Sequence, residues 1–262
     1  MNLIESNYFS AEAMLHYMST SQFKQFEDCE ARAMSILRGE VVDEREAFIE
    51  GHYFEAIITG RRAEFEAENA ETIISSRGET KGQPKSNYRA VIESANAFTR
   101  QPAFSDIIDR CEQQKILTGI IAGVPFKCKL DFFDAETLSE WDSKCMRNFE
   151  RIFDEKELHY AAWYFVRGYH YQAAISRELI RQNFGSAGAC GIIAATKEAV
   201  PDVAWIVFDD SVLDNALEIV AAFAPKYAAI KRNEVEAERC EKCDWCKQTK
   251  TLTEPDQVLV YE

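Results

Sequence analysis

No run of apolar residues in this chain approaches the roughly 20 residues that a membrane-spanning helix requires, which argues against a transmembrane protein. The first residues, Met1 to Ser6, carry neither a basic patch nor the apolar core of a secretory signal, which argues against export. Internal repeats and low-complexity tracts are also absent. We therefore expect a soluble, cytoplasmic protein built from ordinary helices and strands.

Positive charge is scarce as well. The 30 Lys and Arg residues against 44 Asp and Glu residues give a formal net charge of -14. Because DNA affinity depends mainly on cationic groups that meet phosphates, this balance disfavours a nucleic-acid binder without excluding one. An enzyme can confine its lysines and arginines to one groove, while acidic residues elsewhere keep its exterior soluble.

Core-forming residues, by contrast, are plentiful. An apolar share of 47% is ample for a packed core, and 262 residues suffice for one large domain or two small ones. We expect a single domain over residues 1–262, with a cysteine segment at about 238–250. Eight cysteines in an apparently cytosolic chain indicate thiols or metal ligands rather than disulfides.

Residue patterns predict helices on both sides of a strand-rich centre. Helical spacing with suitable start and stop residues predicts helices over residues 19–37, 44–58, 88–98, 154–184 and 212–232. Strand-forming residues predict strands over 115–121, 124–133, 137–145, 190–196 and 203–208, the first three as a meander. Residues 75–87, which contain Gly, Pro and several Ser and Lys, are predicted to be a mobile loop.

The meander carries residues suited to a metal site. Asp131 ends one predicted strand, and Asp142 and Lys144 lie two apart on the next, so they share a face. Two carboxylates suit magnesium, which prefers oxygen ligands and keeps waters that a phosphate can replace. The ion would stabilise the phosphate and help to ionise a water, while Lys144 would orient the hydroxide. By spacing alone, a solvated strand face is the commoner origin of such a triplet.

Several segments around this triplet share their order and spacing with a known family. They are residues 18–31 (MSTSQFKQFEDCEA), 51–55 (GHYFE), 129–132 (KLDF) with 140–144 (EWDSK), and 168–174 (GYHYQAA). Together they resemble the exonuclease VIII (RecE-like) branch of the PD-(D/E)-x-K nuclease superfamily, found largely in phages and prophages. The resemblance implies an α/β, restriction-endonuclease-like core, with a central mixed sheet, an active-site hairpin and flanking helices.

The resemblance also implies roles for individual residues. Asp131 and Asp142 correspond to the metal-binding carboxylates, Lys144 to the catalytic lysine, and the backbone carbonyl of Ser143 to a further metal ligand. Gln172 corresponds to a glutamine that helps to position the substrate or the catalytic lysine. An ordinary polar residue on an amphipathic helix is an equal alternative for Gln172, because the tyrosine expected four residues later is Ser176.

The second predicted helix departs from the family pattern. Many relatives carry Gly-x-x-x-His there, with the histidine touching a metal, whereas Glu55 stands at that position here. A carboxylate is a reasonable substitute at a magnesium site, so we expect Glu55 to be a ligand. His52 on the same helix, and Glu112, which resembles an acidic residue ahead of the hairpin in some relatives, are weaker candidates.

The implied activity is magnesium- or manganese-dependent hydrolysis of linear double-stranded DNA from an end, for phage-type recombination. The implied partners are a single-strand annealing protein and further copies of the chain in a ring. One alternative is a single-strand or structure-specific enzyme, similar to the cysteine-cluster nucleases of CRISPR adaptation and of the RecB and AddB helicase partners. Another is a non-catalytic acidic DNA mimic, which the net charge of -14 suggests.

The last cysteines form a separate motif. Cys240, Cys243 and Cys246 have spacings suited to zinc or to an iron–sulfur cluster. In cluster-bearing relatives a fourth cysteine comes from near the N-terminus, and Cys29 stands at a comparable place. The resemblance therefore implies a four-cysteine site that holds a 4Fe–4S cluster ahead of zinc, with reduced surface thiols as the alternative. The remaining cysteines are expected in the core: Cys111, Cys128, Cys145 and Cys190.

Overall fold

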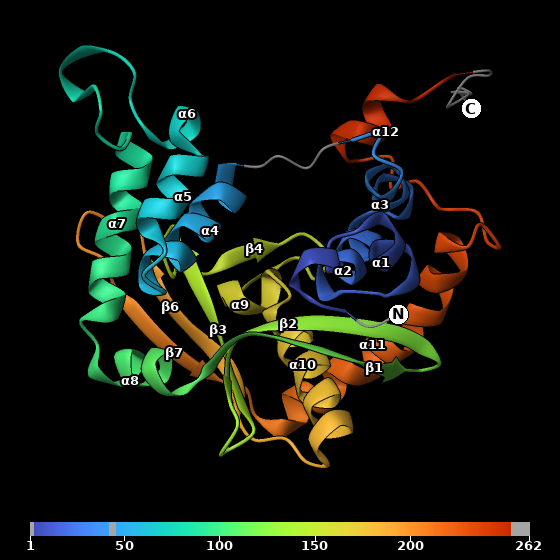
Figure 1. Ribbon diagram of the computed structural model, residues 1–262. Helices are drawn as coiled ribbons and strands as arrows, with labels where there is room; N and C mark the ends of the chain where they lie inside the picture. Colours follow the sequence, from blue (N-terminus) through green and yellow to red (C-terminus); the bar gives the residue numbers. More distant parts are fainter. Residues whose placement is uncertain (1–2, 42–45, 253–262) are drawn as a thin grey trace.

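A computed structural model describes residues 3–41 and 46–252 of the chain (Figure 1). Its centre is a five-stranded sheet with the strand order β1-β2-β3-β6-β7. These strands are β1 (Glu112–Ile121), β2 (Val124–Asp134), β3 (Ser139–Met146), β6 (Cys190–Thr196) and β7 (Val203–Val207). β1, β2 and β3 pair antiparallel, β3 and β6 pair parallel, and β6 and β7 pair antiparallel. The predicted mixed sheet and its meander are confirmed.

Helices cover both faces of this sheet. The N-terminal elements are η1 (Glu5–Asn7), α1 (Ala11–His16), α2 (Thr20–Asp28) and α3 (Glu30–Leu37). The next group is α4 (Glu46–Ile58), α5 (Arg62–Glu68), α6 (Ala70–Ile73), η2 (Gly78–Thr80), α7 (Ser86–Thr99) and α8 (Pro102–Arg110). The C-terminal helices are α9 (Trp163–Val166), α10 (Tyr169–Phe184), α11 (Asp210–Lys231) and α12 (Asp244–Gln248). In Figure 1, α4 to α8 lie on one side of the sheet, and α10 and α11 lie on the other.

Strand β6 shows why the sheet needs two layers of helices. Every residue of β6 is buried, and successive side chains of a strand point to opposite faces. Cys190, Ile192 and Ala194 belong to the core that contains α10 and α11 residues, whereas Ile193 and Ala195 belong to the core that contains α4 and α7 residues. β6 pairs parallel with β3, and a parallel strand that is buried on both faces is typical of an α/β protein.

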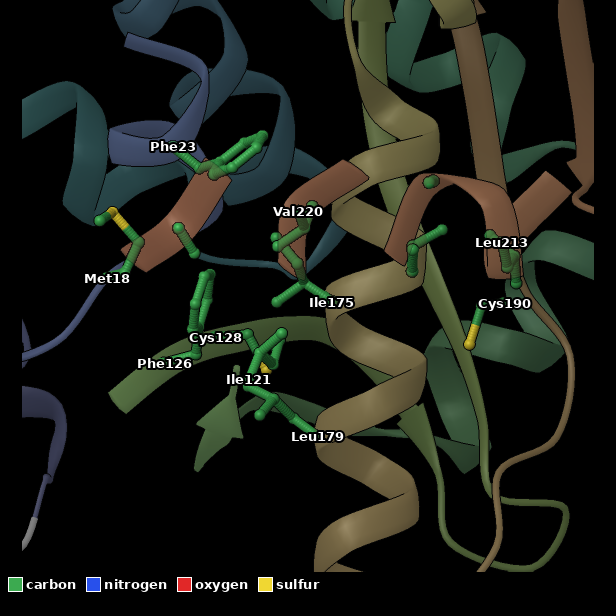
Figure 2. Packing of buried hydrophobic residues seen from close by; sticks show 14 of the residues in the cluster. Met18, Phe23, Ile121, Phe126, Cys128, Ile175, Leu179, Cys190, Leu213 and Val220 are labelled. Carbon is green, nitrogen blue, oxygen red and sulfur yellow. The ribbon is translucent and has the colours of Figure 1, made fainter. Parts of the chain in front are cut away.

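The larger core holds the long helix α10 against the sheet (Figure 2). Phe126 on β2, Ile175 and Leu179 on α10, and Val220 on α11 are all buried within it. Each such side chain contributes about 1.5–3 kcal/mol when it leaves water. This packing fixes the orientation of α10, which carries Gln172 towards β3.

The predicted helix over 154–184 is wrong in its first part. Residues 152–161 form a hairpin of β4 (Ile152–Asp154) and β5 (His159–Ala161), and α10 begins only at Tyr169. Leu158 has a φ of 55° and Gly168 a φ of 64°. Both values lie in the left-handed region, which an α-helix cannot accommodate, so they mark the turn of the hairpin and the break before α10.

The predicted helix over 19–37 is divided into α2 and α3. Cys29 separates them with an extended backbone, at a φ of −166° and a ψ of 110°. Its Sγ accepts a hydrogen bond from the backbone N–H of Arg32 at 3.5 Å, so the cysteine caps α3. This break turns the thiol of Cys29 towards the C-terminal cysteines.

Other predicted elements agree with the structure. α7 and α11 confirm the helices predicted over 88–98 and 212–232, and α4 starts at Glu46, since residues 44 and 45 lie outside the described residues. Among the described residues, none of the helices combines the length and apolarity needed to cross a bilayer.

Candidate active site

Strands β2 and β3 separate where the sequence places the catalytic residues. Their ladder runs from Asp134 opposite Ser139 to Phe132 opposite Trp141 and then stops. On its other edge, β3 pairs with β6 from Glu140 to Met146. Asp131 and Asp142 are the next residues after the last pair of β2 and β3, so their side chains meet at the fork between the two strands.

Asp142 is buried, and two neighbours hold its carboxylate. The ammonium group of Lys144 forms an ion pair with Oδ2, and Gln172 Nε2 donates a hydrogen bond to Oδ1 at 2.7 Å. Lys144 also lies over the ring of Tyr169, with its Nζ 5.2 Å from the ring centroid. Helix α10 therefore provides both the amide that fixes Asp142 and the ring that supports Lys144.

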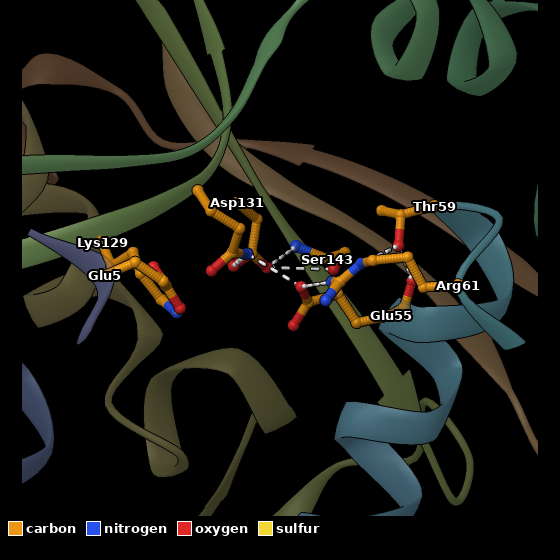
Figure 3. A network of polar contacts seen from close by, with 8 residues as sticks. Glu5, Glu55, Thr59, Arg61, Lys129, Asp131 and Ser143 are labelled. Carbon is orange, nitrogen blue, oxygen red and sulfur yellow. Dashed lines mark hydrogen bonds and ion pairs between the residues drawn. The ribbon is translucent and has the colours of Figure 1, made fainter. Parts of the chain in front are cut away.

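Asp131 is held by the residue that lies between Asp142 and Lys144. Its Oδ2 accepts hydrogen bonds from the backbone N–H and the hydroxyl of Ser143, each at 2.9 Å (Figure 3). The N–H of Ser143 is available because β3 has left β2 at this point. The predicted role of the Ser143 carbonyl as a metal ligand stays a prediction, since Ser143 contacts Asp131 through its N–H and its hydroxyl.

Glu55 reaches the same place from helix α4 (Figure 3). Its Oε1 accepts hydrogen bonds from Arg61 Nη2 at 3.0 Å and from Gln114 Nε2 at 2.9 Å. The same Nε2 of Gln114 also donates to Asp131 Oδ1, at 3.3 Å. Three carboxylates from α4, β2 and β3 therefore converge beside one lysine.

The weaker candidates lie further out. Glu112 has a half-exposed side chain that pairs with Lys115 at 2.9 Å, so the structure does not bring its carboxylate to the group formed by Glu55, Asp131 and Asp142. His52 lies on the exposed side of α4. Partial desolvation by neighbouring groups, followed by the charge of Lys129, still lowers its pKa, and the charge of Asp131 acts in the opposite direction.

Gln114 was not identified from the sequence. It lies in β1 with a φ of 57°, and the β1–β2 ladder passes from Gln113 opposite Phe132 to Lys115 opposite Leu130. Gln114, which the ladder omits, therefore lies opposite Asp131. From there its amide reaches the carboxylates of both Asp131 and Glu55. The sequence offers no motif for this residue, because its position depends on the strand register and on a local backbone irregularity.

Charge is unbalanced in this cluster. Burial, together with the charge of Asp131, raises the pKa of Glu55 to about 7. Burial also raises the pKa of Asp142 to about 6, with Lys144 acting against the shift and Asp131 adding to it. Behind Asp142, burial and the same two aspartates raise the pKa of Glu140, whose Oε2 accepts no hydrogen bond from the described residues. Oxygen donors with this excess of negative charge fit a divalent cation.

A small pocket opens beside this cluster, and its lining is basic and hydroxylated. It is lined by Tyr8, Ser19, Thr20, Ser21, Lys24, Lys127, Cys128, Lys129, Gln172 and Ser176. Burial and the nearby charge of Lys144 lower the pKa of Lys24 to about 8, and burial alone lowers that of Lys127 to about 8. In a chain of net charge -14, three lysines are thus gathered in one pocket beside the carboxylates.

The structure also brings four predicted cysteines together. The sulfur atoms of Cys29, Cys240, Cys243 and Cys246 all lie within 4.8 Å of one another. Cys29 Sγ and Cys246 Sγ are 3.6 Å apart, and both residues are buried. Burial raises the pKa of Cys246 to about 12, whereas backbone N–H groups, acting against burial, lower that of Cys240 to about 6. Such a group is able to hold a metal.

The other cysteines lie elsewhere. Cys111, Cys128 and Cys190 are buried, as predicted, whereas Cys145 is only half-buried. The thiol of Cys145 donates a hydrogen bond to Ser94 Oγ at 3.7 Å, and Cys145 packs against the edge of the core that contains α4 and α7 residues.

The mixed sheet, the forked strands and the convergence of Asp131, Asp142 and Lys144 define a nuclease of the PD-(D/E)-x-K type. The chain belongs to the family described as "PDDEXK-like domain of unknown function (DUF3799)", which matches residues 19–249. It is similar to a "Putative exonuclease" from Eubacterium rectale of known crystal structure, with 31% identity and a TM-score of 0.88 over 98% of this chain and 97% of that chain. No curated protein matches it.

Gln114 gives a first prediction. Replacing it with leucine keeps the size of the side chain but leaves Glu55 and Asp131 without their shared donor. A hydrogen bond to a charged group contributes about 1.5–3 kcal/mol, so we expect cleavage to fall about tenfold or more. Initial rates of DNA digestion measure the effect. Gln113→Leu, at the exposed neighbouring position, is the control, and an equal loss in both variants would contradict a specific role for Gln114.

Proposed function

We propose that this chain is a magnesium- or manganese-dependent exodeoxyribonuclease that degrades linear double-stranded DNA from an end. The observation that carries the proposal is the meeting of Glu55, Asp131 and Asp142 with Lys144 at the fork between β2 and β3. Family membership supports the nuclease class, and the name of the Eubacterium rectale protein supports an exonuclease in particular. A non-catalytic DNA mimic would gain nothing from this convergence.

The chain's own residues account for much of the proposed chemistry. Glu55, Asp131 and Asp142 would hold the divalent ion, which supplies a water of lowered pKa and neutralises charge on the phosphate. Gln172 keeps Asp142 in one orientation, and Ser143 does the same for Asp131. The Lys144 ammonium, held by Asp142 and Tyr169, stabilises the negative charge that develops on the attacked phosphate.

Digestion of three substrates tests this function. Blunt linear duplex, covalently closed circular duplex and single-stranded DNA would be incubated with magnesium, with manganese and with EDTA. We expect loss of the linear duplex only, in both metals, and no loss in EDTA. Cleavage of the circle would instead indicate an endonuclease, and cleavage of single strands alone would favour the second candidate, a single-strand or structure-specific nuclease with a metal at its cysteines.

A role in phage-type recombination follows from end degradation. An enzyme that removes one strand from a DNA end leaves a single-stranded tail, which an annealing protein can bind. A ring of several copies around the duplex would keep the enzyme on its substrate. Copurification of tagged chain with a single-strand annealing protein, and the mass of the assembly in light scattering, test these two proposals.

Zinc is the metal that we propose for the four cysteines. Zinc–thiolate bonds of about 2.3 Å in a tetrahedron place the sulfur atoms about 3.8 Å apart. The sulfur atoms here are 3.6 Å apart for Cys29 and Cys246 and 3.9 Å for Cys240 and Cys246, and none exceeds 4.8 Å from another. A 4Fe–4S cluster, which the sequence placed ahead of zinc, spreads its ligands over four iron atoms and needs wider spacing.

Metal analysis decides between the two. Protein purified without oxygen is expected to contain about one zinc per chain and to be colourless. About four irons per chain, with broad absorption near ~400 nm from thiolate-bound iron, would support the cluster instead.

Glu55 gives a second prediction. Glu55→Gln keeps the hydrogen bond to Arg61 in reach but removes a charge that the metal would neutralise. We expect a clearly higher magnesium concentration for half-maximal cleavage, by about tenfold, with little change in thermal stability. A magnesium titration of the cleavage rate measures this. Glu64→Gln on α5, an exposed position, is the control, and an unchanged magnesium requirement for Glu55→Gln would remove Glu55 from the ligand set.

A further inference from the structure

The hairpin β4–β5 presents two exposed aromatic rings. Phe153 and Tyr160 lie directly opposite each other in its register, so both side chains point to the same face. Phe153 is 44% exposed and Tyr160 is 61% exposed. Their ring centroids are 5.4 Å apart with planes at 68°, so the rings do not cover each other face to face. Aromatic faces therefore remain open to solvent on this hairpin.

The opposite face of the hairpin explains what holds it in place. Ile152, the neighbour of Phe153, packs against the larger core, and its partner Ala161 is half-buried. Arg151 donates a hydrogen bond to the carbonyl of Tyr160. At the turn, Lys156 forms an ion pair with Glu27 of α2 at 3.4 Å. One face of the hairpin thus packs against the protein, whereas Phe153 and Tyr160 lie on the face that is exposed to solvent.

A continuous series of ring contacts leads from the catalytic lysine to this hairpin. Lys144 lies over Tyr169, and the ring of Tyr169 is 5.8 Å from that of Trp163. Trp163 in turn stacks on Phe149, with centroids 5.3 Å apart and planes at 19°. Phe149 lies three residues before β4 begins at Ile152. These contacts link the base of the hairpin to Tyr169, the ring that supports Lys144.

We propose that Phe153 and Tyr160 bind the unpaired bases of a DNA strand by stacking, next to the catalytic site. This inference rests on the proposed nuclease function and specifies one substrate contact of that site. Every base has a π-face, so stacking on aromatic side chains suits a strand of any sequence. Arg147 and Arg167, which precede and follow the hairpin in the chain, are exposed and would supply positive charge for the phosphates of such a strand.

Stabilising the hairpin does not by itself require aromatic residues at positions 153 and 160. β-Branched side chains at paired positions also favour strands, and they expose less apolar surface. Leu158 at the turn is 74% exposed and Phe165 in α9, which contacts β4, is 39% exposed, so further apolar side chains are exposed near the two rings. A surface of this kind beside an active site is typical of a binding site.

The double variant Phe153→Val with Tyr160→Val tests the inference. It keeps strand-forming residues but removes both rings. We expect its affinity for a fluorescein-labelled single-stranded 20-mer, measured by anisotropy in calcium, to fall about 10- to 100-fold. Affinity for a blunt duplex should change by less than about threefold, since its bases are already stacked. Phe223→Val is the matched control, because Phe223 is an aromatic residue of α11 with a similar exposure of 48%.

A second variant keeps the test decisive if the first does not fold. Tyr160→Trp retains an aromatic face, so its affinity for the single strand should stay within about threefold. The fluorescence of the added indole should be quenched when the strand binds. Unchanged affinity in a folded double variant, or an unquenched indole, would overturn the inference. So would a change in the mass of the assembly without a change in DNA affinity, which would make the rings a contact between copies of the chain.

A small substrate separates this inference from the proposed function. Bis(p-nitrophenyl) phosphate has no DNA strand that could extend to the hairpin, so the double variant should hydrolyse it as fast as the wild-type protein does. If wild-type protein hydrolyses neither this ester nor DNA with any divalent ion, the proposed nuclease function fails. The strand affinities then still decide whether the rings bind bases.

Discussion

Asp142→Ala is expected to abolish DNA cleavage, and Asp131→Ala and Lys144→Ala are expected to do the same. Each change removes a metal ligand or a charge that stabilises the transition state, and such groups contribute about 10²- to 10³-fold or more to the rate. For Asp142 the loss is compounded, because Gln172 and Lys144 both depend on its carboxylate for their positions. Initial rates on blunt linear duplex, in magnesium, measure the effect.

Circular dichroism and thermal melting establish that these variants remain folded. Glu218→Ala, which removes an exposed carboxylate from α11, should keep full activity. Calcium should bind the wild-type site yet support little turnover, because its looser coordination positions the attacking water poorly. Robust cleavage by Asp142→Ala would refute the assignment of the active site.

Removal of the metal from the four-cysteine site is expected to have the second large effect, this time on stability. The site joins the start of α3 to the segment that precedes and includes α12, across more than 200 residues of chain. A structural metal contributes its binding free energy to folding, since the unfolded chain has no preformed site. We expect Cys246→Ser to lose the metal and to melt at least about 10 °C lower, which corresponds to a few kcal/mol for a domain of this size.

Cys145→Ser is the control for this prediction, because Cys145 is half-buried and lies outside the cluster. It should keep the metal and melt within about 3 °C of the wild-type protein. Cleavage by the folded fraction of Cys246→Ser at low temperature should persist, since the thiols take no part in hydrolysis. A wild-type protein that holds no metal and melts at the same temperature as Cys246→Ser would show that the cysteines are ordinary thiols.

The amino-acid sequence by itself determined the class of the protein and predicted the residues at the centre of its candidate site. The strand-forming residues over 115–145 are local signals, and the period of two along a strand is enough to place Asp142 and Lys144 on one face. The cysteine spacing is equally local. The motifs therefore identified the parts of the chain that carry both candidate metal sites, as well as the mixed sheet.

Only the tertiary structure decided which further groups reach that centre. Gln114 and Glu140 become neighbours of Asp131 and Asp142 through the register of β1 and through burial, neither of which leaves a motif in the sequence. Glu112, two residues from Gln114, pairs with Lys115 instead. The hairpin over 152–161 could not be recognised in a stretch whose sequence predicts a helix. It depends on the left-handed backbone of Leu158 and on packing of Ile152 against core residues that are far away in the sequence. Long-range contacts override local propensity at such positions, and sequence patterns report only the local part of that balance.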